Sequence, residues 1–416
     1  MEKMHRYPIF LPVLLLLLTA CEPAPTSMPP PSMEPSIPAI IPTIASTIAP
    51  TPAPTLASTP APTLTYTLDP TLTPSSEPSL FTTLIPTQGA SAAEIDAYLN
   101  SLMVANQFSG SVLVALEGQV ILSKGYGLAD LAGNLPNTPA TRFKIGSVTK
   151  QFTALAILML QDRGMLTVAD PLCNFISECP AAWAGITLHH LLTHTSGIRD
   201  YFFLPEYESL KSKPTTTLQL IAHFKDKSLL FAPGSDWDYS NSNYLLLGQV
   251  IEQVSGQPFS LFLQENIFDP LHMTSSGYGS RLVSLARGYT GSGDEWFTVD
   301  STDPSVSCAA GSLYSTVEDM YLWDRALYTE QLLPQDLLTL MFSPQASGRL
   351  GDYGYGWFIA RKFGQPVIWH PGGIDGFRAI IARYPDQEAV FILLSNRETT
   401  DVGGITDAIA GMVFGE

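Results

Sequence analysis

Hydrophobic residues recur at helical spacing after residue 147. Apolar side chains from Phe152 to Met159 follow one another at three- and four-residue steps. This pattern predicts a helix with an apolar face over residues 147–163. Gly164 comes directly after the run and favours the end of the helix there.

Shorter apolar runs predict strands near both ends of the globular part. The runs 111–116 and 120–123 are separated by Glu117-Gly-Gln119, which favours a β-hairpin. Strand-like runs return towards the C-terminus, at 356–360, 366–369, 377–382 and 389–394.

Helical patterns open and close the globular part, at 92–106 and at 403–414, and the middle of the chain is mainly helical from about 147 to 340. Terminal strands and helices around a helical insertion predict an α+β fold. We expect an antiparallel sheet flanked by the terminal helices, together with a mainly helical domain.

The first 20 residues predict a signal peptide. Lys3 and Arg6 precede an apolar core from Ile9 to Leu18, which is too short to span a membrane. The run ends in Leu18-Thr-Ala-Cys21, which resembles a bacterial lipobox and implies cleavage before Cys21 and lipidation of its sulfur. We therefore expect an extracytoplasmic protein whose partner is the membrane, held through a lipid anchor. The alternative is an ordinary secreted protein with an incidental cysteine.

Residues 21–89 have the composition of a tether. The stretch 22–88 holds 17 of the chain's 34 prolines, and Thr, Ser and Ala fill most of the rest. Such a segment cannot bury a core, so we expect it to stay extended and solvated. The catalytic domain is then expected over 90–416, a length that can bury a large core.

Net charge and cysteine positions limit the possible partners and predict the states of the thiols. The formal net charge of −17 argues against a nucleic-acid partner. Cys173 and Cys179 lie six residues apart in a loop bounded by prolines, and in an oxidising compartment they are expected to form a disulfide. Cys308 is then left over as a buried free thiol.

Ser147 and Lys150 are the first candidate catalytic residues. Positions i and i+3 lie on one face of a helix, so the hydroxyl and the amine can touch. A buried lysine loses part of its charge and can then take a proton from a serine hydroxyl. A serine at a helix start also offers its own N–H to an oxyanion. The pair predicts an acyl-transfer nucleophile, although such a serine is often only a helix cap.

Two further groupings point to the same chemistry. Tyr239 and Asn241 stand just before an apolar helical run. A phenolate near a cationic Lys150 would be favoured, which makes Tyr239 a candidate general base. His370 begins His370-Pro-Gly-Gly373 at the end of the run 366–369. Glycines there allow a substrate backbone to approach, and the N–H of Gly373 can act as a second oxyanion donor. A packed tyrosine, a capping asparagine and a simple turn are the structural alternatives.

With these residues in view, the chain resembles the serine β-lactamase and penicillin-binding family, in the branch of class C β-lactamases, DD-peptidases and related esterases. The resemblance covers about residues 95–412. It rests on five segments in the family's order: Phe143-Lys-Ile-Gly-Ser-Val-Thr-Lys-Gln-Phe152, Leu191-Leu-Thr-His-Thr-Ser-Gly197, Tyr239-Ser-Asn241, Gly311-Ser-Leu-Tyr-Ser-Thr316 and His370-Pro-Gly-Gly-Ile-Asp-Gly-Phe377.

The resemblance implies a β-lactamase/DD-peptidase-like fold with the active site between its two parts. It implies that Ser147 is acylated, that Lys150 activates it, and that Tyr239 moves a proton to the leaving group and later helps to activate water. Asn241 would hold the substrate amide or orient Lys150.

The segment that begins at His370 stands where the family has the third of its catalytic motifs. There the resemblance implies that Gly372 lines the substrate site and that the N–H groups of Ser147 and Gly373 form the oxyanion hole. This motif is often Lys-Thr-Gly, whereas this chain has His370-Pro-Gly372. Since a histidine titrates near neutrality, the exchange weakens the case for a dedicated β-lactamase. Two alternatives remain for Arg378: it supplies the missing cation, or it faces solvent.

Other sites find less support. His190 and His194 can share a helix face near His189, as metal ligands sometimes do, but no acidic residue lies among the three. Gly125-Tyr-Gly127 lacks the third glycine of a nucleotide loop, and no Gly-x-Ser-x-Gly segment marks an α/β-hydrolase. We expect no metal and no cofactor.

The sequence leaves three functions open. The first is a lipid-anchored serine hydrolase that cleaves an amide or ester in a small molecule or peptide, as a DD-peptidase, D-amino-acid peptidase or esterase. The second is a β-lactamase, and the third is a non-catalytic surface binding or sensing module. Intact Ser147, Lys150 and Tyr239 argue against the third. We expect a monomer.

Overall fold

The computed structural model describes residues 90–279, 285–293, 295–300, 302–348 and 350–415. The expected signal peptide, Cys21 and the tether lie outside these residues. Within them, no helix combines the length and the apolar character that crossing a membrane requires.

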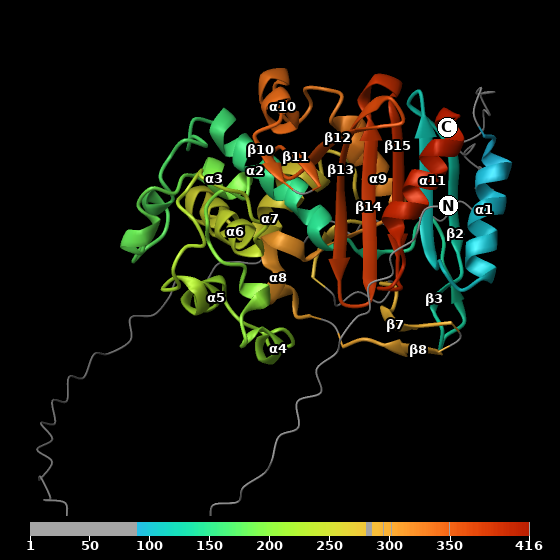
Figure 1. Ribbon diagram of the computed structural model, residues 1–416, viewed down its shortest axis with the longest axis horizontal. Helices are drawn as coiled ribbons and strands as arrows, with labels where there is room; N and C mark the ends of the chain where they lie inside the picture. Colours follow the sequence, from blue (N-terminus) through green and yellow to red (C-terminus); the bar gives the residue numbers. More distant parts are fainter. Residues whose placement is uncertain (1–89, 280–284, 294, 301, 349, 416) are drawn as a thin grey trace, which may run out of the picture. The chain divides into compact units, whose positions relative to one another are not determined.

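An antiparallel sheet forms one side of the described part. Its eight strands follow the order β10-β11-β12-β13-β14-β15-β1-β2, so segments from near the two ends of the described part pair side by side (Figure 1). The strands span β1 Gly110–Leu116, β2 Gln119–Tyr126, β10 Ala346–Gly348, β11 Gly351–Tyr353, β12 Phe358–Lys362, β13 Gln365–Ile374, β14 Phe377–Tyr384 and β15 Ala389–Ser395.

The terminal helices cover one face of this sheet. Helix α1 (Ala92–Val104) packs on β2, and α11 (Val402–Phe414) packs on β14 and β15 (Figure 1). Because side chains alternate across a strand, Val112 packs with the terminal helices, whereas its neighbour Leu113 packs with the helical part on the other face.

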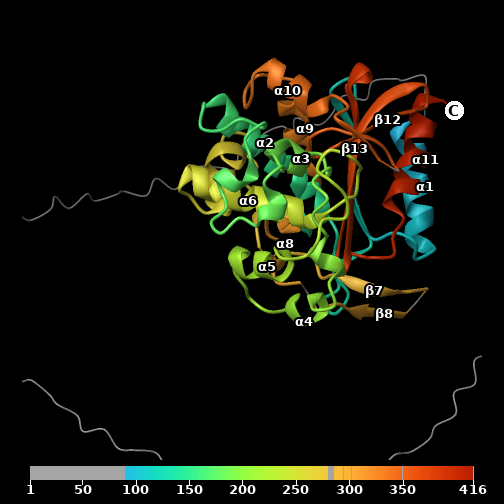
Figure 2. The same ribbon diagram turned by 60° about the vertical axis from the view of Figure 1, so that its left-hand side comes forward.

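The opposite face of the sheet packs against a mainly helical part (Figure 2). Its helices are α2 Thr149–Asp162, α3 Leu188–Leu192, α4 Tyr207–Leu210, α5 Thr217–Phe224, α6 Asn241–Ser255, α7 Phe259–Leu263, α8 Pro304–Gly311, α9 Val317–Ala326 and α10 Gln335–Phe342. Helix α2 is buried on every side from Thr149 to Leu160 and lies against α6 and α8. The fold is therefore the α+β arrangement that the sequence predicts.

Smaller elements connect these layers. The short strands are β3 Leu128–Asp130, β4 Leu135–Pro136, β5 Phe143–Lys144, β6 Gly277–Tyr278, β7 Tyr289–Ser292, β8 Glu295–Thr298 and β9 Leu313–Ser315. Single helical turns are η1 Gly146–Val148, η2 Leu172–Asn174, η3 Ala181–Trp183, η4 Tyr201–Phe203, η5 Gln264–Phe268 and η6 Pro385–Gln387.

Two local details differ from the sequence-based expectation. Ser147 lies in η1, a turn of 3₁₀ helix that leads into α2, rather than inside the α-helix itself. Strand β13 continues through His370-Pro-Gly-Gly373 to Ile374 instead of ending before it. A proline fits there because β12 pairs with β13 only as far as Trp369, which leaves one edge of β13 without a strand partner in the described residues.

Candidate active site

Ser147 and Lys150 lie in contact at the start of α2. The Nζ atom of Lys150 lies 3.2 Å from the Oγ atom of Ser147. The lysine side chain is 0 % exposed, and its burial lowers its pKa to about 7, against the opposing charge of Asp200. At neutral pH a large fraction of Lys150 is therefore uncharged and able to accept a proton from Ser147.

Two other groups hold the amine in place. Lys150 Nζ donates to the side-chain oxygen Oδ1 of Asn241 at 2.8 Å and to the backbone oxygen of Ala310 at 2.9 Å. Together with Ser147 these partners account for the three protons that a charged lysine can donate. The amine is therefore fixed beside the hydroxyl that it has to activate.

The carbonyl of Ala310 reaches Lys150 because α8 is kinked. At Cys308 the backbone has φ 37° and ψ −131°, a conformation that interrupts the helix. Beyond the kink, Ala309 accepts from the hydroxyl of Thr153 at 2.7 Å, and Ala310 accepts from Lys150. A strained residue beside a catalytic group is a common feature of active sites. The sequence offered no signal for this carbonyl.

Tyr239 lies beside both catalytic candidates. Lys150 Nζ lies 4.8 Å from the centre of its ring, and the phenol is hydrogen-bonded to Ser147. Burial nevertheless raises the pKa of Tyr239 well above its usual value, and the bond to Ser147 offsets this only in part. The expectation of a favoured phenolate is thus wrong, because desolvation outweighs the bond with Ser147 and the charge of Asp200 raises the pKa of the phenol further. Tyr239 is a protonated phenol at neutral pH and is placed to donate or relay a proton.

His370 is an enclosed, neutral histidine. Its ring is 1 % exposed, with Nε2 3.2 Å from the hydroxyl of Tyr353 and Nδ1 2.6 Å from the carbonyl of Pro371. Burial and the charge of Lys150 lower its pKa to about 3. The expected titration near neutrality is therefore wrong, and His370 is not a cation at neutral pH.

The glycines of β13 lie directly against the turn that carries Ser147. A Cβ atom on Gly372 would stand 2.0 Å from the carbonyl oxygen of Ile145, and one on Gly146 would stand 2.8 Å from the backbone nitrogen of Gly373. Only glycine allows these two backbones to approach so closely. Ser147 and Gly373, the two expected oxyanion donors, therefore belong to adjoining backbone segments.

Arg378 lies on the other face of the sheet. It pairs with Gly373 across β13 and β14, and its Nη1 would be 3.1 Å from a Cβ on that glycine. Gly372, one residue earlier, points towards Ile145, so the alternation of side chains directs Gly373 and Arg378 away from Ser147. Arg378 does not replace the missing cation of the third motif.

His189, His190 and His194 lie within the part of the chain that the structure describes. Within the described residues, no group of three or more His, Cys, Asp or Glu side chains could hold a metal ion. His194 is instead buried against Tyr239, with a ring-centre separation of 4.3 Å, and accepts from the backbone N–H of Ser240 at 3.2 Å. Burial lowers the pKa of His194 well below its usual value. His194 is therefore a neutral ring packed against Tyr239.

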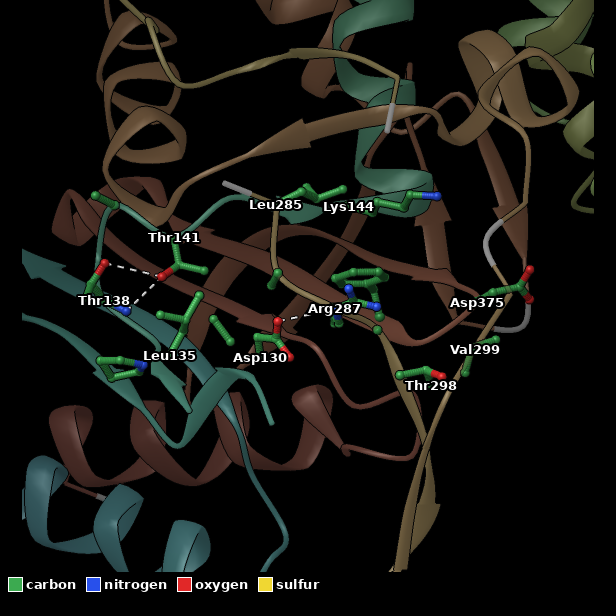
Figure 3. A pocket seen from close by; sticks show the side chains of 16 residues that line it. Asp130, Leu135, Thr138, Thr141, Lys144, Leu285, Arg287, Thr298, Val299 and Asp375 are labelled. Atoms are coloured by element: carbon green, nitrogen blue, oxygen red, sulfur yellow. Dashed lines mark hydrogen bonds and ion pairs between the residues drawn. The ribbon is translucent and has the colours of Figure 1, made fainter. Parts of the chain in front are cut away.

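The cysteines have the states that the sequence predicts. Cys173 and Cys179 are joined by a disulfide, and Cys308 is a buried free thiol. A cavity of about 800 Å³ includes Lys144 and Asp375 in its lining (Figure 3). Neither Ser147, Lys150 nor Tyr239 lines this cavity.

Comparison with known proteins shows which family has this arrangement of residues. The model of the family described as Beta-lactamase matches residues 95–413. This chain belongs to the beta-lactamase family. PbpX of Bacillus subtilis (strain 168) is 32% identical over 293 residues, covering 70% of this chain and 71% of PbpX.

Solved structures agree with this membership. A penicillin binding protein from Bacillus halodurans has a TM-score of 0.69 and 30% identity, over 76% of this chain and 99% of that one. An octameric penicillin-binding protein homologue from Pyrococcus abyssi has a TM-score of 0.71 and 27% identity, over 79% of this chain and 78% of that one. The resemblance found in the sequence is confirmed, and the chain is a serine hydrolase of the β-lactamase-related family.

Proposed function

We propose that the protein is an extracytoplasmic, lipid-anchored serine hydrolase that cleaves an amide or ester in a D-amino-acid peptide or related ester through an acyl-enzyme on Ser147. The observation that carries this proposal is the 3.2 Å contact between Ser147 Oγ and a fully buried Lys150. A lysine whose charge is disfavoured by burial can remove the hydroxyl proton without a metal or a histidine base.

The first half-reaction forms the acyl-enzyme. Neutral Lys150 takes the proton of Ser147 while Oγ bonds to the substrate carbonyl carbon. The carbonyl oxygen becomes an oxyanion that the N–H groups of Ser147 and Gly373 stabilise. As the bond to the leaving amine or alcohol breaks, Tyr239 donates a proton to that group and is reprotonated from the Lys150 ammonium.

The second half-reaction returns the enzyme to its starting state. A water molecule gives one proton to the Tyr239 and Lys150 pair and adds its oxygen to the acyl carbon. The bond to Ser147 Oγ then breaks, the acid product leaves, and the proton returns to Oγ. The same groups therefore serve both steps with reversed proton transfers.

The edge of β13 supports a peptide as the substrate. Residues 370–374 pair with β14 but, among the described residues, have no strand on their other edge. An extended peptide can add to such an edge through backbone hydrogen bonds. The names of the B. halodurans and P. abyssi proteins, a penicillin binding protein and a penicillin-binding protein homologue, support a site that also binds penicillins.

A β-lactamase is the second candidate, since it uses the same acylation step and differs in how fast the acyl-enzyme is hydrolysed. The neutral state of His370 speaks against it, because no fixed cation stands at the place of the family's lysine. The distinguishing quantity is the lifetime of the penicilloyl adduct.

The test of function is turnover on a small panel of substrates. The full chain and its Ser147→Ala variant are compared on an N-acylated D-alanyl-D-alanine peptide and on p-nitrophenyl acetate. We expect hydrolysis of at least one substrate that falls by about three or more orders of magnitude in the variant. Equal rates for the two proteins on every substrate would refute the proposal.

The anchor is tested separately from the chemistry. The apolar run before Cys21 and the Leu-Thr-Ala-Cys ending support lipidation of that residue. Cells expressing the protein are grown with radioactive palmitate, and the wild type is compared with Cys21→Ala. Label on the wild type alone supports the anchor, and equal label on both would overturn it.

A further inference from the structure

Asp200 is a buried carboxylate directly behind the catalytic lysine. It is only 6% exposed and precedes the helical turn η4. Its Oδ2 accepts from the side-chain N–H of Asn241 at 2.8 Å, and its Oδ1 accepts from the backbone N–H of Phe202 at 3.0 Å. The bond to Phe202 is a local cap, whereas the bond to Asn241 reaches into the active site.

Asn241 connects Asp200 to the lysine. While its Nδ2 donates to Asp200, its Oδ1 accepts from Lys150 Nζ at 2.8 Å, and that Nζ lies 3.2 Å from Ser147 Oγ. An ionised carboxylate can only accept hydrogen bonds, so it allows only one orientation of the carboxamide. The oxygen of Asn241 therefore faces the lysine because a carboxylate faces its nitrogen.

Asp200 also supplies the negative charge that acts on Lys150. Among the residues that the structure describes, the other titratable side chains near the amine are phenols and histidines: Tyr239 and Tyr244, whose rings face Nζ, and His194 and His370, whose pKa values burial and the lysine both lower. None of these carries a negative charge at neutral pH.

Among the described groups that interact with the Asp200 carboxylate, Lys150 is the one that can carry a positive charge. Burial raises the pKa of Asp200, and the charge of Lys150 and the bonds from Phe202 and Asn241 oppose that rise. The phenols that feel its charge, Tyr201, Tyr207 and Tyr239, all have pKa values raised further by it. They remain neutral, so Lys150 is the positive partner in this network.

We propose that Asp200 is a positioning residue of this hydrolase: through Asn241 it holds an acceptor against Lys150 Nζ, and its buried carboxylate supplies the negative charge on the far side of that carboxamide. The proposal rests on the function proposed above, since it assigns the residue that sets the pH range of the Ser147 reaction.

The charge is tested by the pH dependence of kcat/KM in Asp200→Asn. The substrate is p-nitrophenyl acetate, which carries no titratable group, and the rate of Ser147→Ala is subtracted at each pH. Because neutral Lys150 is the active form, removal of the negative charge should move the acid limb to lower pH by roughly one unit. An acid limb at the wild-type position would overturn the charge role.

The positioning is tested by Asp200→Ala, which removes the acceptor as well as the charge. Asn241 can then turn its carboxamide, and the plateau of kcat/KM should fall by roughly 10- to 100-fold while KM changes less than kcat. A plateau equal to that of the wild type would overturn the positioning role.

Asp319→Asn is the matched control. Asp319 is also 6% exposed, and its carboxylate accepts from the backbone N–H of Ser275 and the hydroxyl of Ser276 at 2.8 and 2.7 Å. Its loss should lower the melting temperature but leave the acid limb in place. If it moved the limb as far as Asp200→Asn does, the specific link to Lys150 would be refuted.

Three outcomes distinguish a folding defect, a failure of the proposed function and a failure of this inference. If Asp200→Asn does not fold, Asp200→Glu keeps both the charge and the acceptor, and its acid limb should stay at the wild-type position; a limb at lower pH would contradict the proposal. If the wild-type chain shows no hydrolysis that depends on Ser147, the proposed function fails and the role of Asp200 falls with it. If the wild type is active and the Asp200 variants keep its profile, the proposed function stands and this inference alone fails.

Discussion

Gly146 and Gly373 lie so close that a single side-chain carbon would not fit between them. A Cβ on Gly146 would stand 2.8 Å from the backbone nitrogen of Gly373 and 2.9 Å from its oxygen. The turn that carries the nucleophile is therefore seated on the strand that offers the second oxyanion donor. This relationship, more than any one side chain, sets the distance between Ser147 and the donor on β13.

Substitution of Gly146 by alanine should damage the active site. The new Cβ would push η1 away from β13, so we expect kcat to fall by about 100-fold, as displacements of about 1 Å can do. Gly164→Ala is the control, since Gly164 has φ 68° with nothing within 4 Å and Gly146 has φ 52°. Both variants bear the strain of a left-handed alanine, about 1–2 kcal/mol. Equal activity of the two variants would contradict the role given to the contact.

The reaction rate should rise with pH across the neutral range. Burial lowers the pKa of Lys150 to about 7, and only the uncharged amine can take the Ser147 proton. A plot of kcat/KM for an uncharged ester should therefore climb through about pH 7 and level off above it. A rate that stays flat or declines as the pH rises through this range would show that Lys150 is not the base.

Acid should destabilise the protein in part through His370. The folded state holds this ring neutral with a pKa of about 3, against 6.5 for an ordinary histidine. The unfolded chain therefore binds more protons between these values, and the free energy of unfolding falls as the pH drops from 6.5 towards 3.

His370→Gln removes this proton-binding group. The slope of unfolding free energy against pH below neutrality should become shallower by up to about 1.4 kcal/mol per pH unit. Denaturant titrations at a series of pH values measure the slope. An unchanged slope would mean that His370 is protonated equally in both states.

The ion pair of Asp324 and Arg383 should matter for stability. The two side chains are 0% and 2% exposed, and Arg383 Nε lies 2.9 Å from Asp324 Oδ1. Asp324→Asn leaves a buried guanidinium without its counter-charge, so we expect a loss of about 3–5 kcal/mol.

The exposed pair of Arg325 and Glu388 provides the comparison. Glu388 is 51% exposed in this pair, and Glu388→Gln should cost less than about 1 kcal/mol. Chemical denaturation of the two variants gives both values. A smaller loss for Asp324→Asn than for Glu388→Gln would contradict this account.

Much of the fold was predictable because its helices and its first hairpin depend on short stretches of sequence. The expected helices 92–106 and 403–414 correspond to α1 Ala92–Val104 and α11 Val402–Phe414. The hairpin was predictable because Gly118 lies between two apolar runs. In the structure Glu117 and Gly118 both take positive φ, as a two-residue turn requires. The strand through Pro371 was not predictable, since the missing pairing with β12 depends on the three-dimensional arrangement.

The active site was predictable only in part. Ser147 and Lys150 needed nothing beyond helical spacing to be placed together. The protonation states of Tyr239 and His370 were predicted wrongly, because burial depends on side chains far away in sequence. Asp200 was missed because no spacing distinguishes it from other acidic residues, and its role arises from Asn241, 41 residues later.

The most direct test of the account is the intact mass of the chain after mixing with a penicillin, followed by peptide mapping. The account predicts a penicilloyl adduct on Ser147 that is absent in Ser147→Ala. A long-lived adduct would match a penicillin-binding protein and a short-lived one a β-lactamase. An adduct on another residue, or one that persists in Ser147→Ala, would contradict the assignment of Ser147 as the nucleophile.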